Sequence, residues 1–199
     1  MFAQKCNTKY DGINMDLALY LDESTLVKYP DDEYMQDKDT VINSTGTGTL
    51  GRVGIYRRTD NRREMPVVPD SHVTVIRANN EISAEYIYHF LKAYQQELEK
   101  LGEGSTNQKE LKPLTLKNLI VALPPYAEQE RIGNRIIQYK SHSSKSSEEH
   151  LSDYDSSLRN IFTKAMKIKQ SDLNGRKNIK IKPSKLCILC TQVHNMRWL

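Results

Sequence analysis

The sequence lacks several features that would place the protein in a class at once. No run of apolar residues approaches the roughly 18 that a membrane-spanning helix needs. The first residues, MFAQKCNTKYDG, contain no apolar stretch of the kind found in signal peptides. Only three of the 199 residues are cysteines, too few for the disulfide framework of a small secreted protein. We therefore expect a reduced, cytoplasmic protein that does not enter a membrane.

Charge is unevenly distributed along the chain. Residues 1–40 contain 4 Lys and Arg against 9 Asp and Glu, so the remaining residues carry +9 although the net charge is only +4. The basic residues concentrate between Arg52 and Arg63 and between Lys164 and Lys185. A basic surface attracts phosphate backbones through counterion release. Since charged runs are also common on ordinary solvated surfaces, charge alone does not establish DNA binding.

Up to residue 126 the pattern predicts strands mixed with helices. A helix is expected from Ser83 to about Leu101, because its apolar residues recur at helical spacing and Gly102 follows its end. A single helical turn is expected at Leu116–Leu119. Segments rich in β-branched or aromatic residues predict strands. These segments are 41–42, 53–56, 73–77 and 120–123.

After residue 126 the sequence predicts helices without strands. One charged helix is expected at Glu128–Lys140, and the serine-rich residues 141–147 interrupt it. A second is expected at about 148–168, where apolar residues follow coiled-coil spacing. We expect these helices to need each other, or another chain, to bury their apolar stripes. Residues 170–199 show no clear period and predict a loose basic tail.

Two polar loops interrupt the predicted strands and helices, at Ser44–Gly51 and Gly104–Glu110. The first matches G-x-G-x-x-G, but the other protein-kinase motifs are absent. A dinucleotide site would need a helix directly after the glycines, and the residues after Gly51 favour a strand. Two interpretations remain, a nest of backbone N–H groups, hydroxyls and Arg52 for an oxyanion such as a DNA phosphate, or a plain hairpin turn.

Two further motifs are weak indications of chemistry. Leu123-Pro124-Pro125-Tyr126 is similar to the Asn/Asp-Pro-Pro-Tyr motif of amino-methyltransferases, but leucine cannot accept the hydrogen bond that holds the target amine. Cys187, Cys190 and His194 offer three metal ligands, whereas structural zinc usually takes four. We therefore expect no catalytic residue and no metal site.

One family accounts for the order of these segments. INSTGTGTLGRVGIY, DSHVTVIR and EYIYHFLKAYQQELEKLGEGSTNQKELKPLTLKNLIVALPPYAEQERI together resemble the DNA specificity (S) subunit of type I restriction-modification enzymes. The resemblance runs from about Asp39 to Ile132. It rests on two glycine-hydroxyl loops, the helix between them and the PP-x-x-EQ-x-x-I junction, all in the same order.

The resemblance implies an α+β fold, with a curled mixed-sheet target recognition domain followed by an extended helical, coiled-coil spacer. The implied divisions are a recognition domain at 1–126, expected to be N-terminally incomplete, a helical dimerisation arm at 127–169 and a basic, poorly ordered tail at 170–199. It also implies a non-catalytic protein with no cofactor of its own. S-adenosylmethionine and ATP with Mg²⁺ are expected on the methyltransferase (M) and restriction (R) subunits.

The resemblance also implies where DNA binds. Hydroxyls and backbone N–H groups hold phosphates, while Arg, Asn and Gln side chains can contact base edges. The candidate DNA-binding residues are Ser44, Thr45, Gly46, Thr47, Gly48, Thr49, Arg52, Arg57, Arg58, Gly104, Ser105, Thr106, Asn107, Gln108 and Lys109.

The expected function is sequence-specific binding of double-stranded DNA by a half-subunit. It would direct a methyltransferase and endonuclease to one half of a bipartite site, and pair through its helices with a second copy or a sister half-subunit. One alternative is a truncated S-subunit remnant that only oligomerises or docks on a methyltransferase. Another is a nucleotide-binding or transfer enzyme built on Gly46–Gly51 or Pro124-Pro125.

Overall fold

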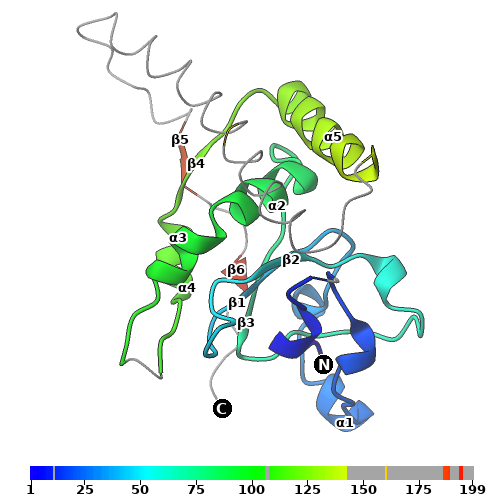
Figure 1. Cartoon of the computed structure of the whole chain (residues 1–199). Helices are drawn as coiled ribbons and strands as arrows, with labels where there is room; N and C mark the ends of the chain where they lie inside the picture. The colour runs from blue at the N-terminus through cyan, green and yellow to red at the C-terminus, as the bar shows by residue number, and fades with distance from the viewer. Residues whose placement is uncertain (11, 106–107, 143–159, 161–185, 189–192, 195–199) are drawn as a thin grey trace, which may run out of the picture.

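The computed structural model describes the chain except for residues 11, 106–107, 143–159, 161–185, 189–192 and 195–199 (Figure 1). The described residues form both helices and antiparallel sheets, with three of the strands before the longer helices, which confirms the α+β class. In chain order the elements are η1 (Gln4–Cys6), η2 (Met15–Leu17), α1 (Glu23–Leu26), η3 (Asp31–Glu33), β1 (Thr40–Asn43), β2 (Val53–Ile55), η4 (Arg58–Asp60), β3 (Val73–Ile76), α2 (Ala84–Ala93), α3 (Gln95–Lys100), α4 (Pro113–Lys117), β4 (Ile120–Ala122), α5 (Tyr126–His142), β5 (Leu186–Ile188) and β6 (Val193–His194).

A small antiparallel sheet lies at the centre of the structure. β1 pairs with β2 on one side and with β3 on the other, with Val41 opposite both Gly54 and Val75. β6 adds to β3, which gives the order β2-β1-β3-β6, and β4 pairs separately with β5. The strands predicted at 41–42, 53–56, 73–77 and 120–123 are thereby confirmed. Within both sheets every pairing is antiparallel, and a parallel bridge joins Phe2 to Pro69.

Both faces of the sheet are covered. Neighbouring residues of a strand point to opposite faces, so Val41 and Val75 pack in one cluster with Phe2, near the N-terminus. Ile42 and Ile76 pack in a second, larger cluster with residues of α2, α4 and α5. Because both faces are buried, the loops at the ends of the strands are the parts of the sheet that can reach another molecule.

The predicted helix 83–101 is divided into α2 and α3. Ser83 caps α2 as expected, since its side chain accepts a hydrogen bond from the Tyr86 N–H. The division falls at Tyr94, and just after it the Gln95 side chain accepts a hydrogen bond from the Val53 N–H at 3.0 Å. The interruption therefore places a polar side chain against β2, a contact that helical periodicity does not reveal.

The expectation that α5 needs another arm or another chain is wrong. α5 is longer than the predicted 128–140, and its Ile132 and Ile136 are buried in the cluster that contains α2. Gly133 lies so close to α2 that a Cβ there would be 3.2 Å from the Glu85 Cβ. The predicted second helix, 148–168, lies outside the described residues apart from residue 160.

Two short strands occur where the sequence predicted only a loose tail. β5 pairs with β4, and β6 pairs with β3. Such short edge strands are held by backbone hydrogen bonds, so they need no regular pattern of apolar residues. The rest of the region 170–199 lies outside the described residues.

Candidate nucleic-acid interface

The two polar loops predicted as DNA contacts lie side by side. We call residues 44–51 the glycine loop and residues 104–109 the second loop. The Leu111 N–H donates to the Ser44 carbonyl at 2.8 Å, and Thr45 forms a β-bridge with Glu110. Glu110 also forms a bridge with Glu103, which closes the second loop as a hairpin. Figure 1 shows both loops turned in the same direction at one end of the molecule. Segments about 60 residues apart in the sequence thus form one continuous edge.

Glycine is required in the glycine loop for two different reasons. Gly46, Gly48 and Gly51 all have φ between +73° and +101°, a region that favours glycine. At Gly51 an added Cβ would also lie 2.7 Å from the backbone nitrogen of Glu99, whereas nothing lies within 4 Å of one at Gly48. The base of the loop is therefore pressed against α3, and its tip is open.

Most hydroxyl groups of the glycine loop are used within the protein. The Ser44 and Thr74 hydroxyls share a hydrogen bond of 2.6 Å, and Thr45 Oγ1 lies 2.9 Å from His72 Nδ1. Thr49 Oγ1 donates to the Thr45 carbonyl at 3.1 Å. Thr47 is exposed, and its hydroxyl has no hydrogen bond to any residue that the structure describes. Of these hydroxyls, that of Thr47 is the one free to contact a ligand directly.

Arg52 holds the glycine loop in place. Its guanidinium donates to the Gly48 carbonyl at 3.2 Å and to the Asn7 carbonyl at 2.9 Å. Partial burial lowers the pKa of Arg52 relative to its ordinary value, because desolvation disfavours the charged form. The side chain is therefore tied between the tip of the loop and the N-terminal residues.

The second loop presents its side chains to solvent. Gly104 has φ +123°, and a Cβ there would collide with the Gln108 carbonyl oxygen, so this turn also requires glycine. The Gln108 N–H donates to the Ser105 carbonyl at 3.0 Å. Ser105, Gln108 and Lys109 are exposed. The two other predicted contacts in this loop, Thr106 and Asn107, lie outside the described residues.

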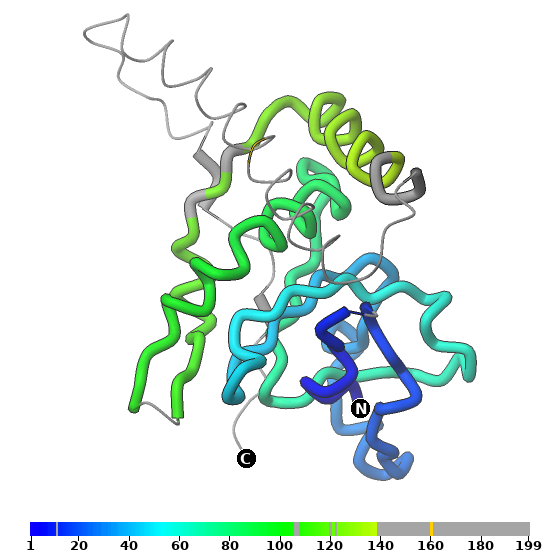
Figure 2. The backbone as a smooth tube through the Cα atoms, in the orientation of Figure 1, coloured from blue at the N-terminus to red at the C-terminus, as the bar shows by residue number. Residues whose placement is uncertain are grey.

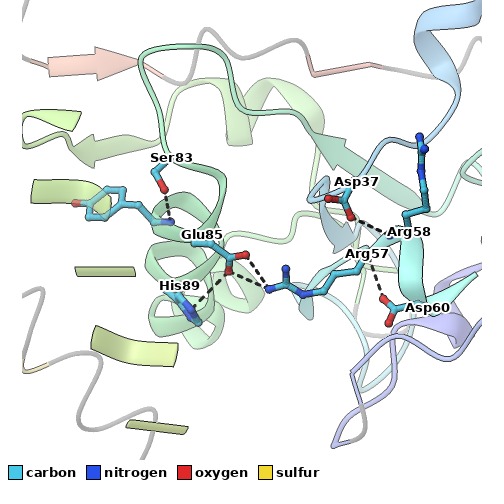
Figure 3. A network of polar contacts seen from close by, with 8 residues as sticks. Asp37, Arg57, Arg58, Asp60, Ser83, Glu85 and His89 are labelled. Atoms are coloured by element: carbon cyan, nitrogen blue, oxygen red, sulfur yellow. Dashed lines mark hydrogen bonds and ion pairs between the residues drawn. The ribbon is translucent and has the colours of Figure 1, made fainter. Parts of the chain in front are cut away.

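The structure does not bring Arg57 and Arg58 to this edge. Both follow β2 at the end opposite to the glycine loop. Arg57 forms an ion pair of 2.8 Å with Glu85 of α2, and its backbone N–H donates to Asp60 (Figure 3). The Arg58 N–H donates to Asp37 at 2.9 Å. The Arg57 side chain therefore joins β2 to α2.

Sequence reasoning missed the polar residues that support the glycine loop. Asn7 and Asn43 are buried, and the Asn7 amide donates to Asn43 Oδ1 at 3.1 Å and to the Arg52 carbonyl at 3.0 Å. His72 Nδ1 lies 2.9 Å from Thr45 Oγ1. No local pattern marks these residues, since each contact joins segments at least 27 residues apart.

Gln129 ties the start of α5 to the residues that precede α2. Its side chain is 1% exposed, accepts a hydrogen bond from the Ser83 N–H, and donates to the Glu81 and Pro124 carbonyls. The Pro124 carbonyl, which would hold a substrate amine in a methyltransferase, is thus bonded within the protein. The Pro-Pro-x-x-Glu-Gln motif fixes where α5 starts.

No group of three or more His, Cys, Asp or Glu side chains among the described residues could hold a metal ion. Cys190 lies outside those residues, as do the side chains of Cys187 and His194. None of the helices in the described part of the chain is long and apolar enough to cross a membrane.

Comparison with known protein families supports the resemblance seen in the sequence. No curated protein matches the chain. The family described as "Type I restriction modification DNA specificity domain" matches residues 3–152, well over half of the chain. The match begins near the N-terminus and includes both loops and α5, whereas the resemblance found in the sequence began only at about Asp39. This family consists of non-catalytic DNA-recognition domains without a cofactor of their own. The chain therefore belongs to the family of type I restriction-modification DNA specificity domains.

Proposed function

We propose that this protein binds double-stranded DNA through the joint edge of the glycine loop and the second loop. The observation that carries the proposal is the backbone pairing between the loops, the Leu111 N–H bonded to the Ser44 carbonyl. Both loops have the composition of a DNA-binding site. The backbone pairing gives them a common orientation. Two loops held side by side can contact neighbouring positions of one duplex, as positioning and base contacts both require.

The two loops have different roles in this proposal. Gln108 and Lys109 contact base edges or phosphates with their side chains, and Asn107 belongs to the same loop. The glycine loop contacts the backbone of DNA at its open tip, Thr47 and Gly48. Ser44, Thr45 and Thr49 fix the shape of that tip from inside the protein.

We further propose that the protein acts as a half-subunit. It directs the methyltransferase and endonuclease to one half of a bipartite site, and residues 127–169 form a helical arm that pairs with a second unit. α5 supports this role because it is anchored on α2 through Ile132 and Ile136 while Ile137 is 40% exposed. A helix fixed in this way can set the spacing between two recognition domains. Methyl transfer belongs to an M subunit with S-adenosylmethionine, and cleavage to an R subunit with ATP.

Mapping of methylated adenines tests the proposal. The full chain is co-expressed with its methyltransferase subunit, and the host genome is compared with that of cells expressing the methyltransferase alone. We expect methylation at a new bipartite motif. A symmetric motif indicates two identical copies, and an asymmetric motif indicates a sister half-subunit.

The alternative function gives a different result. If the chain is a remnant that only oligomerises or docks on the methyltransferase, the complex assembles but methylates no new motif. That outcome, with assembly verified by size-exclusion chromatography, would contradict the proposed function.

A further inference from the structure

A third segment lies against the glycine loop. Residues 4–9, which we call the N-terminal segment, run beside the loop in Figure 2. The Gln4 carbonyl accepts a hydrogen bond from the Asn43 side chain at 3.1 Å, and Gln4 Oε1 lies 3.5 Å from Thr49 Oγ1. The same Gln4 Oε1 would lie 2.8 Å from a Cβ placed at Gly46. The N-terminal segment is thus in contact with the loop itself.

Hydrogen bonds of Asn7 and Arg52 join this segment to the tip of the loop. The Arg52 guanidinium donates one hydrogen bond to the Asn7 carbonyl and another to the Gly48 carbonyl. The Asn7 side-chain amide donates in return to the Arg52 carbonyl. Asn7 is 1% exposed. Hydrogen bonds among buried polar groups are costly to break, because a partner left alone stays desolvated. The segment and the loop therefore keep one relative position.

The N-terminal segment carries exposed positive charge next to the residues that touch the loop. Lys5 and Lys9 are exposed, and neither forms an ion pair with any residue that the structure describes. Lys9 Nζ lies 4.6 Å from the centroid of the Tyr10 ring. The glycine loop contains no charged residue, and Arg52 behind it is bonded to carbonyl groups. A phosphate backbone seated on this loop therefore has exposed cations on either side, Lys109 on the second loop and Lys5 and Lys9 on the N-terminal segment.

We propose that Lys5 and Lys9 bind the phosphate backbone of duplex DNA lying on the two loops, which makes the N-terminal segment a third element of the interface. Asn7 and Arg52 are positioning residues, since they hold this segment at the loop tip. The inference rests on the proposed function and adds to it a surface that lies outside both loops.

Salt dependence tests the role of the two lysines. The full chain binds a fluorescent 30-base-pair duplex of mixed sequence, and affinity is measured over a series of salt concentrations. Each phosphate contact contributes about 0.9 to the slope of log K against log salt concentration. We expect K5A/K9A to reduce the magnitude of that slope by about two and K28A, a matched control after α1, to leave it unchanged. A wild-type slope in K5A/K9A would overturn the inference.

The positioning role needs a separate variant. N7A keeps both lysines but removes the amide that holds the segment to Asn43 and Arg52. We expect a reduced slope in N7A, and no further reduction when N7A is added to K5A/K9A. A purely structural role would instead lower affinity with the wild-type slope, and that result would remove Asn7 from the proposal. Circular dichroism verifies that each variant is folded.

Failure of this inference is distinguishable from failure of the proposed function. If the wild-type chain binds the duplex and the lysine variants keep its slope, the N-terminal segment lies outside the interface and the two loops still account for binding. If methylation mapping finds no new motif, the proposed function fails whatever the salt dependence.

Discussion

The two loops of the candidate interface are held in opposite ways. The glycine loop is fixed from within, because Ser44, Thr45 and Thr49 bond inside the protein and Arg52 ties down its tip. The second loop belongs to a hairpin, and its described residues Ser105, Gln108 and Lys109 are exposed. This difference indicates a division of labour. In the proposed interface the rigid glycine loop fixes how the protein sits on DNA, while the second loop can change its side chains without changing the fold.

The largest loss of unfolding free energy should follow the addition of a methyl group to the glycine loop. G51A places a Cβ 2.7 Å from the Glu99 backbone nitrogen, in a loop pressed against α3. Overpacking costs about 1–3 kcal/mol, and a positive φ adds about 1 kcal/mol for alanine. We therefore expect G51A to lose about 3 kcal/mol of unfolding free energy in urea denaturation.

G48A is the matched control for this prediction. Gly48 also has a positive φ, +74°, but nothing lies within 4 Å of an added Cβ. We expect a loss of only about 1 kcal/mol, from backbone strain alone. Equal losses in G48A and G51A would show that packing on α3 does not fix the loop.

A smaller effect is expected from removing the guanidinium. R52A leaves the Gly48 and Asn7 carbonyls without their donor, and hydrogen bonds to charged groups contribute about 1.5–3 kcal/mol. Because Arg52 is partly exposed, water can replace some of this interaction, and we expect a loss of about 2 kcal/mol in urea denaturation. Faster amide exchange should accompany it at Thr49 and Leu50, whose N–H groups donate to the Gly46 carbonyl within the loop. Unchanged exchange there would contradict a holding role for Arg52.

Substitutions in the second loop should change DNA binding and leave the unfolding free energy almost unchanged. Gln108 and Lys109 are exposed, so Q108A and K109A should change the unfolding free energy by no more than about 0.5 kcal/mol. K109A should reduce the salt slope of DNA binding by about one. Q108A should alter base preference in the methylation map. If Q108A or K109A lost as much unfolding free energy as R52A, the second loop would be held by internal contacts as the glycine loop is.

Local pattern was sufficient for the central strands and for both loops. Val41, Val53 and Val73 mark strands through β-branched runs, and the glycines mark positions where φ is positive. These features depend on residues close in sequence, so one sequence can reveal them. They were enough to suggest the family that the comparison confirms.

Long-range contacts account for what the sequence did not reveal. The role of Arg52 depends on Asn7, which is 45 residues away, and the burial of α5 depends on α2. Arg57 is a candidate DNA contact in the sequence because it follows the glycine loop, but the direction of β2 carries it to the opposite end, beside Glu85. A charged side chain looks the same in sequence whether it is paired inside the protein or free at its surface.

The smallest effect on stability is expected from breaking the ion pair at the base of the second loop. Lys112 Nζ lies 2.8 Å from Glu103 Oε2, and this hydrogen bond raises the pKa of Lys112 above its ordinary value of 10.5. A raised pKa means that the pair stabilises the folded state below pH 10.5 and that its contribution disappears as pH rises through the folded pKa. Both side chains are more than half exposed, so E103Q should leave the melting temperature at pH 7 unchanged within error.

The pKa itself is the sensitive measurement. In an NMR titration of the lysine side chains, E103Q should return the pKa of Lys112 toward 10.5, while E110Q, which removes a weaker contribution, should lower it less. If E103Q instead unfolded the hairpin at pH 7, the second loop would depend on this ion pair as strongly as the glycine loop depends on its buried contacts. The contrast between an internally fixed loop and an exposed one would then disappear.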